Sequence, residues 1–481
     1  MKNRRYFRSF GILTVLLFIT VVSTAQESLR TGYFLNGNLY RHKINPAMMN
    51  DQNYISLPVL GGVSVNAAGD VGIDNFVFRN NAGEKVTFMH SSVDANEFLS
   101  GIGSENKIMA DIDMTIMSAG FSAFGGYNTI DIGFHSRTGA SVPYEMFDFM
   151  KNLDYNSSYS INDVNILTRN YVDIAFGHSR KITKDLTLGA RVKFILGLAY
   201  ADVNLDRVDV ISNPSALKWT VRTQGSANVS FGGDFKYSDN RMINGTKAVN
   251  GYDDPSLGVN GFGMGIDFGA VYDLSNVLTK GLIVSASVTD LGFMNWKKVS
   301  KAAIDQNNPF EFDGFEYVKE HDVSPDNIDE QFNSLKDDLE EFLSFEDKGK
   351  GSESSSLAAT LNLGVEYKMP FYDKLSAGVL FTNRFDGDYS FYKVSLMANI
   401  APVKWFEFAV SGTKSTFGTS FGAMANVRFT GFNLFVGTDC FFSDLGEYSI
   451  PAKDMNASVS VGVNVPFGKR GGKAKKVEIA E

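Results

Sequence analysis

Strict alternation of apolar and polar residues recurs along this chain of 481 residues. In the clearest run, 186–198, one face is entirely apolar, and the other includes Arg191 and Lys193. The apolar positions of this run are Leu186, Leu188, Ala190, Val192, Phe194, Leu196 and Leu198. Because successive side chains of a β-strand point to opposite faces, a period of two predicts a strand whose faces meet unlike surroundings.

Four further runs of this kind are spread over the chain, and they are long. They cover 262–273, 359–368, 420–429 and 457–465. Most have about 10 residues or more, against about five or six in a usual strand and roughly 9 to 11 in a tilted membrane-spanning strand. No apolar stretch in this part of the chain is long enough for a membrane helix. The sequence therefore predicts strands that cross a bilayer.

Alternation alone would also fit a soluble sandwich with one face in water, so the lengths of the connections between the runs are needed to distinguish this fold from a closed barrel. Short links alternate with long ones along the chain. The short links are 125–126, 182–185, 275–280, 370–374, 402–404 and 430–431, and the long ones are 67–108, 140–166, 232–260, 294–356 and 442–454. Outer-membrane barrels combine short periplasmic turns with longer outside loops in this way.

We therefore predict an all-β fold, a transmembrane antiparallel β-barrel of about 14–16 strands over residues 54–467, with long extracellular loops. Placing every short turn on one side favours about 16 strands. The weak stretch 202–231 holds one strand or two, which leaves 14 open as the alternative. An even number of strands in the outer membrane would put both termini in the periplasm.

Two of the long connections have helical patterns of their own. The longest, 294–356, is acidic and has apolar residues at helical spacing after Ser324 and Pro325, which form a favourable helix start. Residues 143–150 predict a second short helix. We expect both helices to pack on the rim of the barrel. The alternative is that the acidic loop forms a site for a ligand or a partner.

The N-terminus has the three parts of a secretory signal peptide, which we predict over residues 1–25. Its basic residues are Lys2, Arg4, Arg5 and Arg8. The apolar run 10–22 has 13 residues, short of the roughly 20 that a membrane helix needs, and residues 23–25 offer a cleavage site. The exported chain would then begin with 26–53, a segment of little strand character, and end with a basic periplasmic tail, 468–481.

Composition narrows the chemistry further. The single cysteine, Cys440, excludes an internal disulfide and a cysteine zinc site, and the net charge of −9 argues against nucleic acid as a partner. The five histidines are scattered without a metal-binding spacing. Residues 418–422 match a nucleophile-elbow pattern, but they lie inside a strand and not at a strand-to-helix turn. We expect no catalytic residue, metal or cofactor, and no enzyme.

Polar and charged residues on the inward faces of the strands are candidates for the lumen. They are Asp131, Asp173, Arg191, Lys193, Asp267, Asp273, Asn362, Glu366 and Arg428. A basic residue facing lipid at the midplane would cost about 2 to 4 kcal/mol, whereas a watery lumen accommodates it. The pattern leaves open whether these side chains line a pore or form a packed network.

A resemblance to a known family starts in the segment 26–53. Its Asn45, Pro46 and Ala47 resemble the Asn-Pro-Ala element of FadL-type long-chain fatty-acid transporter barrels. Two further stretches resemble an uncharacterised family of FadL-like outer-membrane barrels of bacteria with gliding motility or type nine secretion, and these stretches are 171–193 and 261–297. The resemblance covers most of the chain after the signal. It implies a plugged monomeric barrel, with Asn45, Pro46 and Ala47 in an N-terminal hatch, and the passage of hydrophobic molecules.

The chain departs from the transporters in its longer acidic loop and its basic tail, so two functions stay open. The first is FadL-like uptake or transfer of a hydrophobic small molecule through a hatch-gated lumen. The second is a scaffold of a secretion or adhesion complex, acting through loops 67–108 and 294–356. A barrel hydrolase would need a serine and histidine pair at one rim, and the sequence shows none. The expected partners are outer-membrane lipid, a hydrophobic small molecule and, for the scaffold, another envelope protein.

Overall fold

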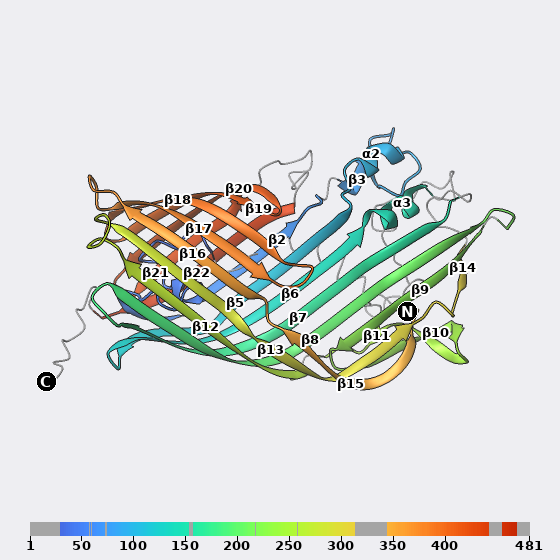
Figure 1. Cartoon of the computed structure of the whole chain (residues 1–481), viewed down its shortest axis with the longest axis horizontal. Coiled ribbons are helices and arrows are strands. Elements are labelled where there is room, and N and C mark those ends of the chain that lie inside the picture. Colours follow the sequence, from blue (N-terminus) through green and yellow to red (C-terminus); the bar gives the residue numbers. More distant parts are fainter. Residues whose placement is uncertain are drawn as a thin grey trace, which may run out of the picture.

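A computed structural model describes residues 29–312, 344–441 and 455–468, apart from 57, 59, 73–74, 153–156, 217 and 257. The signal, the helix predicted after Ser324 and nearly all of the basic tail therefore lie outside the described residues. The described chain is almost entirely strand, and the strands are long and strongly tilted (Figure 1). Within these ranges, no helix is long and apolar enough to cross a bilayer.

The strands close into an antiparallel barrel of 14 strands. In wall order, the strands are β1 (Asn53–Ser56) with β2 (Gly62–Gly69), β5 (Glu105–Ala123), β6 (Gly126–Pro143), β7 (Tyr159–Lys181), β8 (Leu186–Asn213), β9 (Lys218–Ser230) with β12 (Gly261–Asp273), β13 (Leu282–Ile304), β15 (Glu346–Ser356) with β16 (Ala359–Lys368), β17 (Leu375–Phe385), β18 (Phe391–Val403), β19 (Phe406–Ser415), β20 (Gly418–Phe429), β21 (Phe432–Phe441) and β22 (Met455–Phe467). The barrel closes where β22 pairs with β1 and β2. Asn53 lies opposite Phe467, so the start of the first wall strand and the end of the last lie side by side at one rim.

The predicted all-β barrel is confirmed, and its count of 14 strands is the lower of the two that the sequence left open. The preferred count of about 16 is too high because residues 202–213 continue β8, and β9 forms one wall strand with β12. On β8, Tyr200 pairs with the last residue of β9, Ser230, and Gly197 pairs with the first residue of β12, Gly261. One strand therefore continues from β9 into β12, and the hairpin of β10 (Asp234–Ile243) and β11 (Thr246–Asp253) is inserted between them.

Strand β8, with 28 residues, shows how the wall changes with height. In the first half of the strand, the side chain of Phe194 faces outward and is 49% exposed, while Arg191 points inward and is buried. Further along the strand the pattern inverts, with Val203 and Val210 buried on the inner side and Arg207 exposed on the outer side. An apolar outer face suits lipid and a polar one suits water. The far half of β8 therefore extends beyond the membrane.

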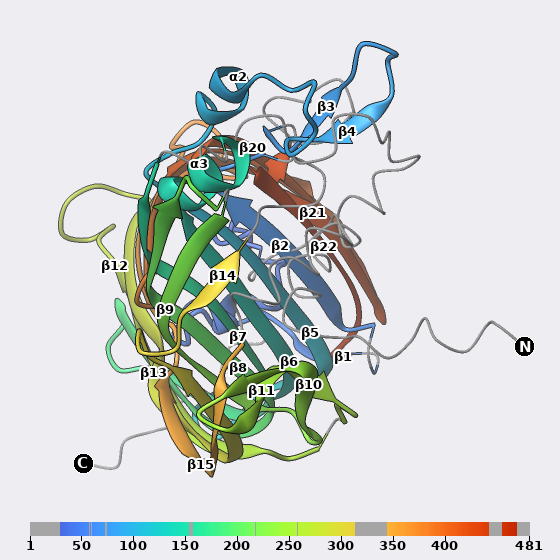
Figure 2. The same ribbon diagram turned by 90° about the vertical axis from the view of Figure 1, so that its right-hand side faces the viewer.

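The extensions of β7, β8, β9 and β13 form a sheet with a hydrophobic core of its own (Figures 1 and 2). Its cover consists of β3 (Val77–Arg79), β4 (Lys85–Thr87), α2 (Ala95–Leu99), α3 (Tyr144–Asn152) and the β10–β11 hairpin, with β14 (Phe310–Phe312) at one side. Trp219 and Phe149 are fully buried at its centre, with ring centroids 5.7 Å apart. We call this part the outer extension.

The outer extension changes the picture of the long loops. The helix predicted over 143–150 is confirmed as α3. The predicted loop 294–356 is shorter than expected, because 294–304 belong to β13 and 346–356 are β15. Polar residues interrupt the alternation in these segments, and the structure shows an irregular register between Trp296 and Val299.

Lys151, near the end of α3, makes the docking of this helix sensitive to pH. Its Nζ donates to the carbonyl oxygen of His90 at 3.0 Å, and burial lowers its pKa from 10.5 to about 8. An undocked α3 would bind more protons between these two pH values, so docking becomes more stable as the pH rises through that window. We expect α3 amides to exchange more slowly, after correction for intrinsic rates, at pH 9.5 than at pH 7.5. Lys151→Met should remove the difference, and a difference that survives this substitution would contradict the assignment.

Candidate functional site

Residues Leu29 to Gln52 lie inside the barrel, and we call them the luminal segment (Figures 1 and 2). Its only helical turn is η1 (Arg41–Lys43), and almost all of its residues are buried. Its side chains bond to widely separated strands of the wall. Thr31 Oγ1 lies 2.7 Å from Ser411 Oγ on β19, and Tyr33 Oη lies 2.9 Å from Ser285 Oγ on β13. The segment thus fills the lumen from side to side.

Asn45, Pro46 and Ala47 sit against two glycines of the wall, Gly189 on β8 and Gly269 on β12, which pair with each other. Asn45 is fully buried, and its Nδ2 donates to Tyr33 Oη at 3.1 Å while its Oδ1 accepts from the backbone N–H of Ala47 at 2.9 Å. A Cβ on Gly189 would lie 2.3 Å from the carbonyl carbon of Pro46, and one on Gly269 would lie 2.1 Å from Asn45 Oδ1. The chain approaches this closely because both wall residues lack a side chain.

A chain of buried charges joins the luminal segment to the wall. Nε2 of His42 lies 3.0 Å from Oδ2 of Asp131 on β6, and the same oxygen lies 3.0 Å from Arg191 on β8. Arg191 also pairs with Asp267 on β12 at 3.0 Å, and Lys193 pairs with the other oxygen of Asp267 at 3.0 Å. The four wall residues are predicted lumen candidates, and the structure brings them into one network.

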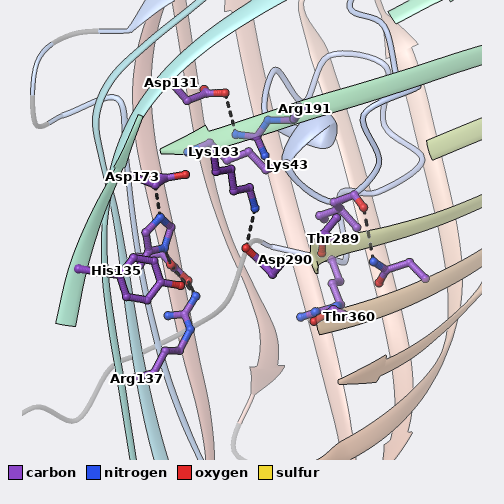
Figure 3. A pocket seen from close by; sticks show the side chains of 15 residues that line it. Lys43, Asp131, His135, Arg137, Asp173, Arg191, Lys193, Thr289, Asp290 and Thr360 are labelled. Carbon is purple, nitrogen blue, oxygen red and sulfur yellow. Dashed lines mark hydrogen bonds and ion pairs between the residues drawn. The ribbon is translucent and has the colours of Figure 1, made fainter. Parts of the chain in front are cut away.

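A second cluster lies beside the first on β5, β6 and β7 (Figure 3). Nε2 of His135 lies 3.0 Å from Asp173, and its Nδ1 makes a short contact with Asp113. Arg137 donates to Asp113 at 2.7 Å, and the ring of Tyr171 stacks on His135 with centroids 4.9 Å apart. The two clusters meet at a cavity, and paired charges form much of its lining.

The cavity has a volume of about 80 Å³. It is lined by Arg30, Lys43, Ile44, Asp113, Asp131, His135, Arg137, Tyr171, Asp173, Arg191, Lys193, Thr289, Asp290, Thr360 and Asn362 (Figure 3). Lys193 pairs with Asp290 at 2.6 Å, and Lys43 donates to Thr115 Oγ1 at 2.7 Å. One water takes up roughly 30 Å³ in the liquid, and ligand pockets for drug-sized molecules have about 300 Å³ or more. The cavity therefore has room for a few waters only.

The other predicted lumen residues lie apart from these clusters. Arg428 holds the end of the luminal segment through two bonds to the carboxylate of Asp51, at 2.8 and 3.0 Å. Asn362 is buried, and its amide points to the carbonyl oxygen of Ile44 at 3.4 Å. Glu366, on β16, is partly buried and belongs to neither cluster. Asp273 does not serve the lumen, because it accepts from the backbone N–H of Ser275 in the β12–β13 turn.

Sequence reasoning missed several partners in the network. Asp113 and Arg137 lie on alternating strands, so their inward direction could have been predicted from parity. His42 and His135 look isolated along the chain, and only the closed barrel brings carboxylates to them. Among the described residues, no group of three or more His, Cys, Asp or Glu side chains is arranged to hold a metal ion.

Several solved structures match the chain over most of its length. The toluene transporter TodX of Pseudomonas putida matches with 9% identity and a TM-score of 0.42, covering 93% of this chain and 95% of that one. TbuX, the toluene transporter of Ralstonia pickettii, has 10% identity, a TM-score of 0.41 and coverages of 89% and 93%. A FadL homologue of Pseudomonas aeruginosa has 10% identity, a TM-score of 0.40 and coverages of 93% and 99%. Similarity at this level concerns the fold and tells nothing of what this barrel carries.

Comparison by sequence leads to a family. No curated protein matches the chain. The model of a family of unknown function, DUF5723, matches residues 46–439, which include most of the barrel wall and begin at Pro46 of the luminal segment. The match confirms the predicted membership of an uncharacterised family. The chain belongs to the family of unknown function DUF5723.

Proposed function

We propose that this chain is an outer-membrane barrel that takes up small hydrophobic molecules through a lumen gated by the luminal segment. The observation that carries the proposal is the fit of Asn45, Pro46 and Ala47 over Gly189 and Gly269. The hydrophobic class of the solute is what the resemblance to FadL-type transporters implies. We place the short turns and both termini in the periplasm, and the outer extension outside the cell.

Passage requires the luminal segment to move. The cavity beside it is polar and too small for a hydrophobic molecule. The segment packs against apolar side chains of the wall and is also held by hydrogen bonds and ion pairs, such as those of Thr31, Tyr33 and Asp51. A single hydrogen bond contributes only about 0.5–1.5 kcal/mol net, because water replaces it when it breaks. Contacts of this kind hold the segment in place and still allow it to leave the wall.

A disulfide between the luminal segment and the wall tests this gate. Thr31 and Ser411 are small, and their side-chain oxygens are 2.7 Å apart, so Thr31→Cys with Ser411→Cys suits a tether. We expect oxidation of this variant, in a Cys440→Ser background, to abolish the uptake of radiolabelled laurate by a host that lacks its own fatty-acid transporters. A reducing agent should restore the uptake.

The matched control places a disulfide within the wall. Ser395 and Thr413 face each other across β18 and β19, with oxygens 2.8 Å apart, so Ser395→Cys with Thr413→Cys leaves the luminal segment free. Its uptake should not depend on oxidation. Laurate uptake that continues with the luminal segment tethered would refute the gate. No uptake by the untethered barrel above an empty host would refute laurate transport.

A scaffold of an envelope complex is the second candidate, and the outer extension favours it. This part has a packed core that includes Trp219, Phe149 and Phe312 and is distinct from the apolar clusters of the luminal segment. Because the outer extension has its own packed core, its surface would present a fixed shape to a partner. The same tether separates the two functions, because a scaffold keeps its cellular role when Thr31 is fixed to Ser411, whereas a transporter loses it.

A further inference from the structure

The turn between β17 and β18 folds into the lumen at the end where the outer extension begins. We call its residues, 386–390, the tongue. Asp386 and Tyr389 are 7% and 4% exposed, although short turns between strands normally face solvent. The turn is shaped by Gly387, which has a φ of +57°, and by a hydrogen bond from the Asp386 N–H to Ser390 Oγ at 2.9 Å.

Ion pairs hold the tongue across the barrel. The carboxylate of Asp386 accepts from Arg169 on β7 at 2.7 Å and from Arg384 on β17 at 2.9 Å. Arg384 in turn donates to Asp111 on β5 at 2.7 Å. All four side chains are buried, so this chain of charges is shielded from water.

Tyr389 extends the contact to the same far wall. Its hydroxyl donates to the carbonyl oxygen of Asn165 on β7 at 3.3 Å and makes a short contact with the side chain of that residue. Its ring lies on Gly139 of β6, where a Cβ would be 2.4 Å from Cε1. Between β7 and β17, the wall contains β8, β12, β13 and β16, so the tongue crosses the lumen and does not bond to a neighbouring strand.

The register of β6 places the tongue above the cavity. Going outward along this strand, Asp131 contacts His42 of the luminal segment, Arg137 lines the cavity, and Gly139 lies under Tyr389. Arg137 also lines the small space beneath the tongue, together with Asp386. The luminal segment therefore lines the polar cavity, and Arg137 lies between this cavity and the small space beneath the tongue.

We propose that the tongue is a second gate, independent of the luminal segment, and that the polar cavity is a compartment closed between the two. This proposal rests on the proposed function for its purpose, since two gates in series would let a solute pass without an open channel. The existence of two gates and a closed compartment does not depend on which solute the barrel carries. Opening requires the Arg169–Asp386 pair to separate, so a variant without the carboxylate should hold the tongue less firmly.

Access to the cavity can be measured with a reporter cysteine. Thr360 lines the cavity and is 6% exposed, so Thr360→Cys in a Cys440→Ser background reports entry of the charged reagent methanethiosulfonate ethylsulfonate. In purified barrel both ends are accessible to the reagent. We expect slow modification, compared with Ser354→Cys on the exposed side of β15. Asp386→Ala should raise the rate at Thr360→Cys by about tenfold or more, which corresponds to a change of roughly 1.4 kcal/mol in the gate.

Asp388→Asn is the matched control, because Asp388 lies on the same turn and is exposed. It should leave the rate unchanged. If Asp386→Ala loses the heat-dependent gel shift of a folded barrel, Tyr389→Ala serves in its place. Rapid modification of Thr360→Cys with an intact tongue would overturn the closed compartment, and slow modification in folded Asp386→Ala or Tyr389→Ala would overturn the tongue as a gate. A barrel that passes this test but takes up no laurate would refute only the proposed function.

Discussion

Replacing Gly189 by valine should push Asn45, Pro46 and Ala47 off the wall and open the lumen to ions. A Cβ at this position would lie 2.3 Å from the carbonyl carbon and oxygen of Pro46 and 2.5 Å from the backbone nitrogen of Ala47. These are backbone atoms, so no side-chain rotation relieves the clash. Overpacking of this kind costs about 1–3 kcal/mol, which would raise the open population by roughly fivefold to a hundredfold.

Single-channel recording in planar bilayers measures this effect directly. We expect frequent openings for Gly189→Val and rare ones for the parent. Gly269→Val should give a weaker effect, because the nearest atom there, Oδ1 of Asn45, belongs to a side chain. Gly412→Val is the matched control, since a Cβ at Gly412 of β19 would meet only the ring of Phe421, at 3.8 Å. A folded Gly189→Val barrel that stays as closed as the parent would show that the segment is not held on these glycines.

Parts of this site could be predicted from the sequence, because side chains alternate strictly between the two faces of a strand. Arg191 and Lys193 share a face of an alternating run, so their common direction was predictable without knowing the fold. The direction of the run was settled by the seven apolar residues on the other face, which only lipid or a core accommodates. The place of Asn45 in the lumen came from a family resemblance, since the tripeptide has no periodic signal.

Other parts could not be predicted, because they depend on contacts between distant segments. Asp111 and Arg384 are 273 positions apart in the chain, and no local pattern pairs them. The tongue looks like any short link, and its inward fold depends on Arg169 across the lumen. Asp290 itself has a φ of +58° and lies where the β12–β13 register is irregular. This irregularity breaks the alternation that would otherwise predict which side chains point inward.

Asp267→Ala should destabilise the barrel more than any single change at its surface. Asp267 has no exposed surface and pairs with both Arg191 and Lys193 at 3.0 Å. Its removal leaves two buried cations short of a partner, and breaking a buried pair in this way costs roughly 3–5 kcal/mol. The temperature at which the heat-dependent gel shift occurs should fall clearly. Glu311→Ala is the control, because its pair with Lys218 is exposed and such pairs contribute about 0–1 kcal/mol.

The double variant Asp267→Ala, Lys193→Met distinguishes stranded charge from lost packing. Methionine fills much of the space of lysine without its charge, so one of the two cations that have lost a partner disappears. The remaining partner of Lys193, Asp290, has a side chain that is 33% exposed and can be hydrated. Part of the lost stability should therefore return. A double variant that is less stable than Asp267→Ala would mean that Lys193 stabilises the wall by packing, and that the charges in the lumen matter less for folding than for what the lumen admits.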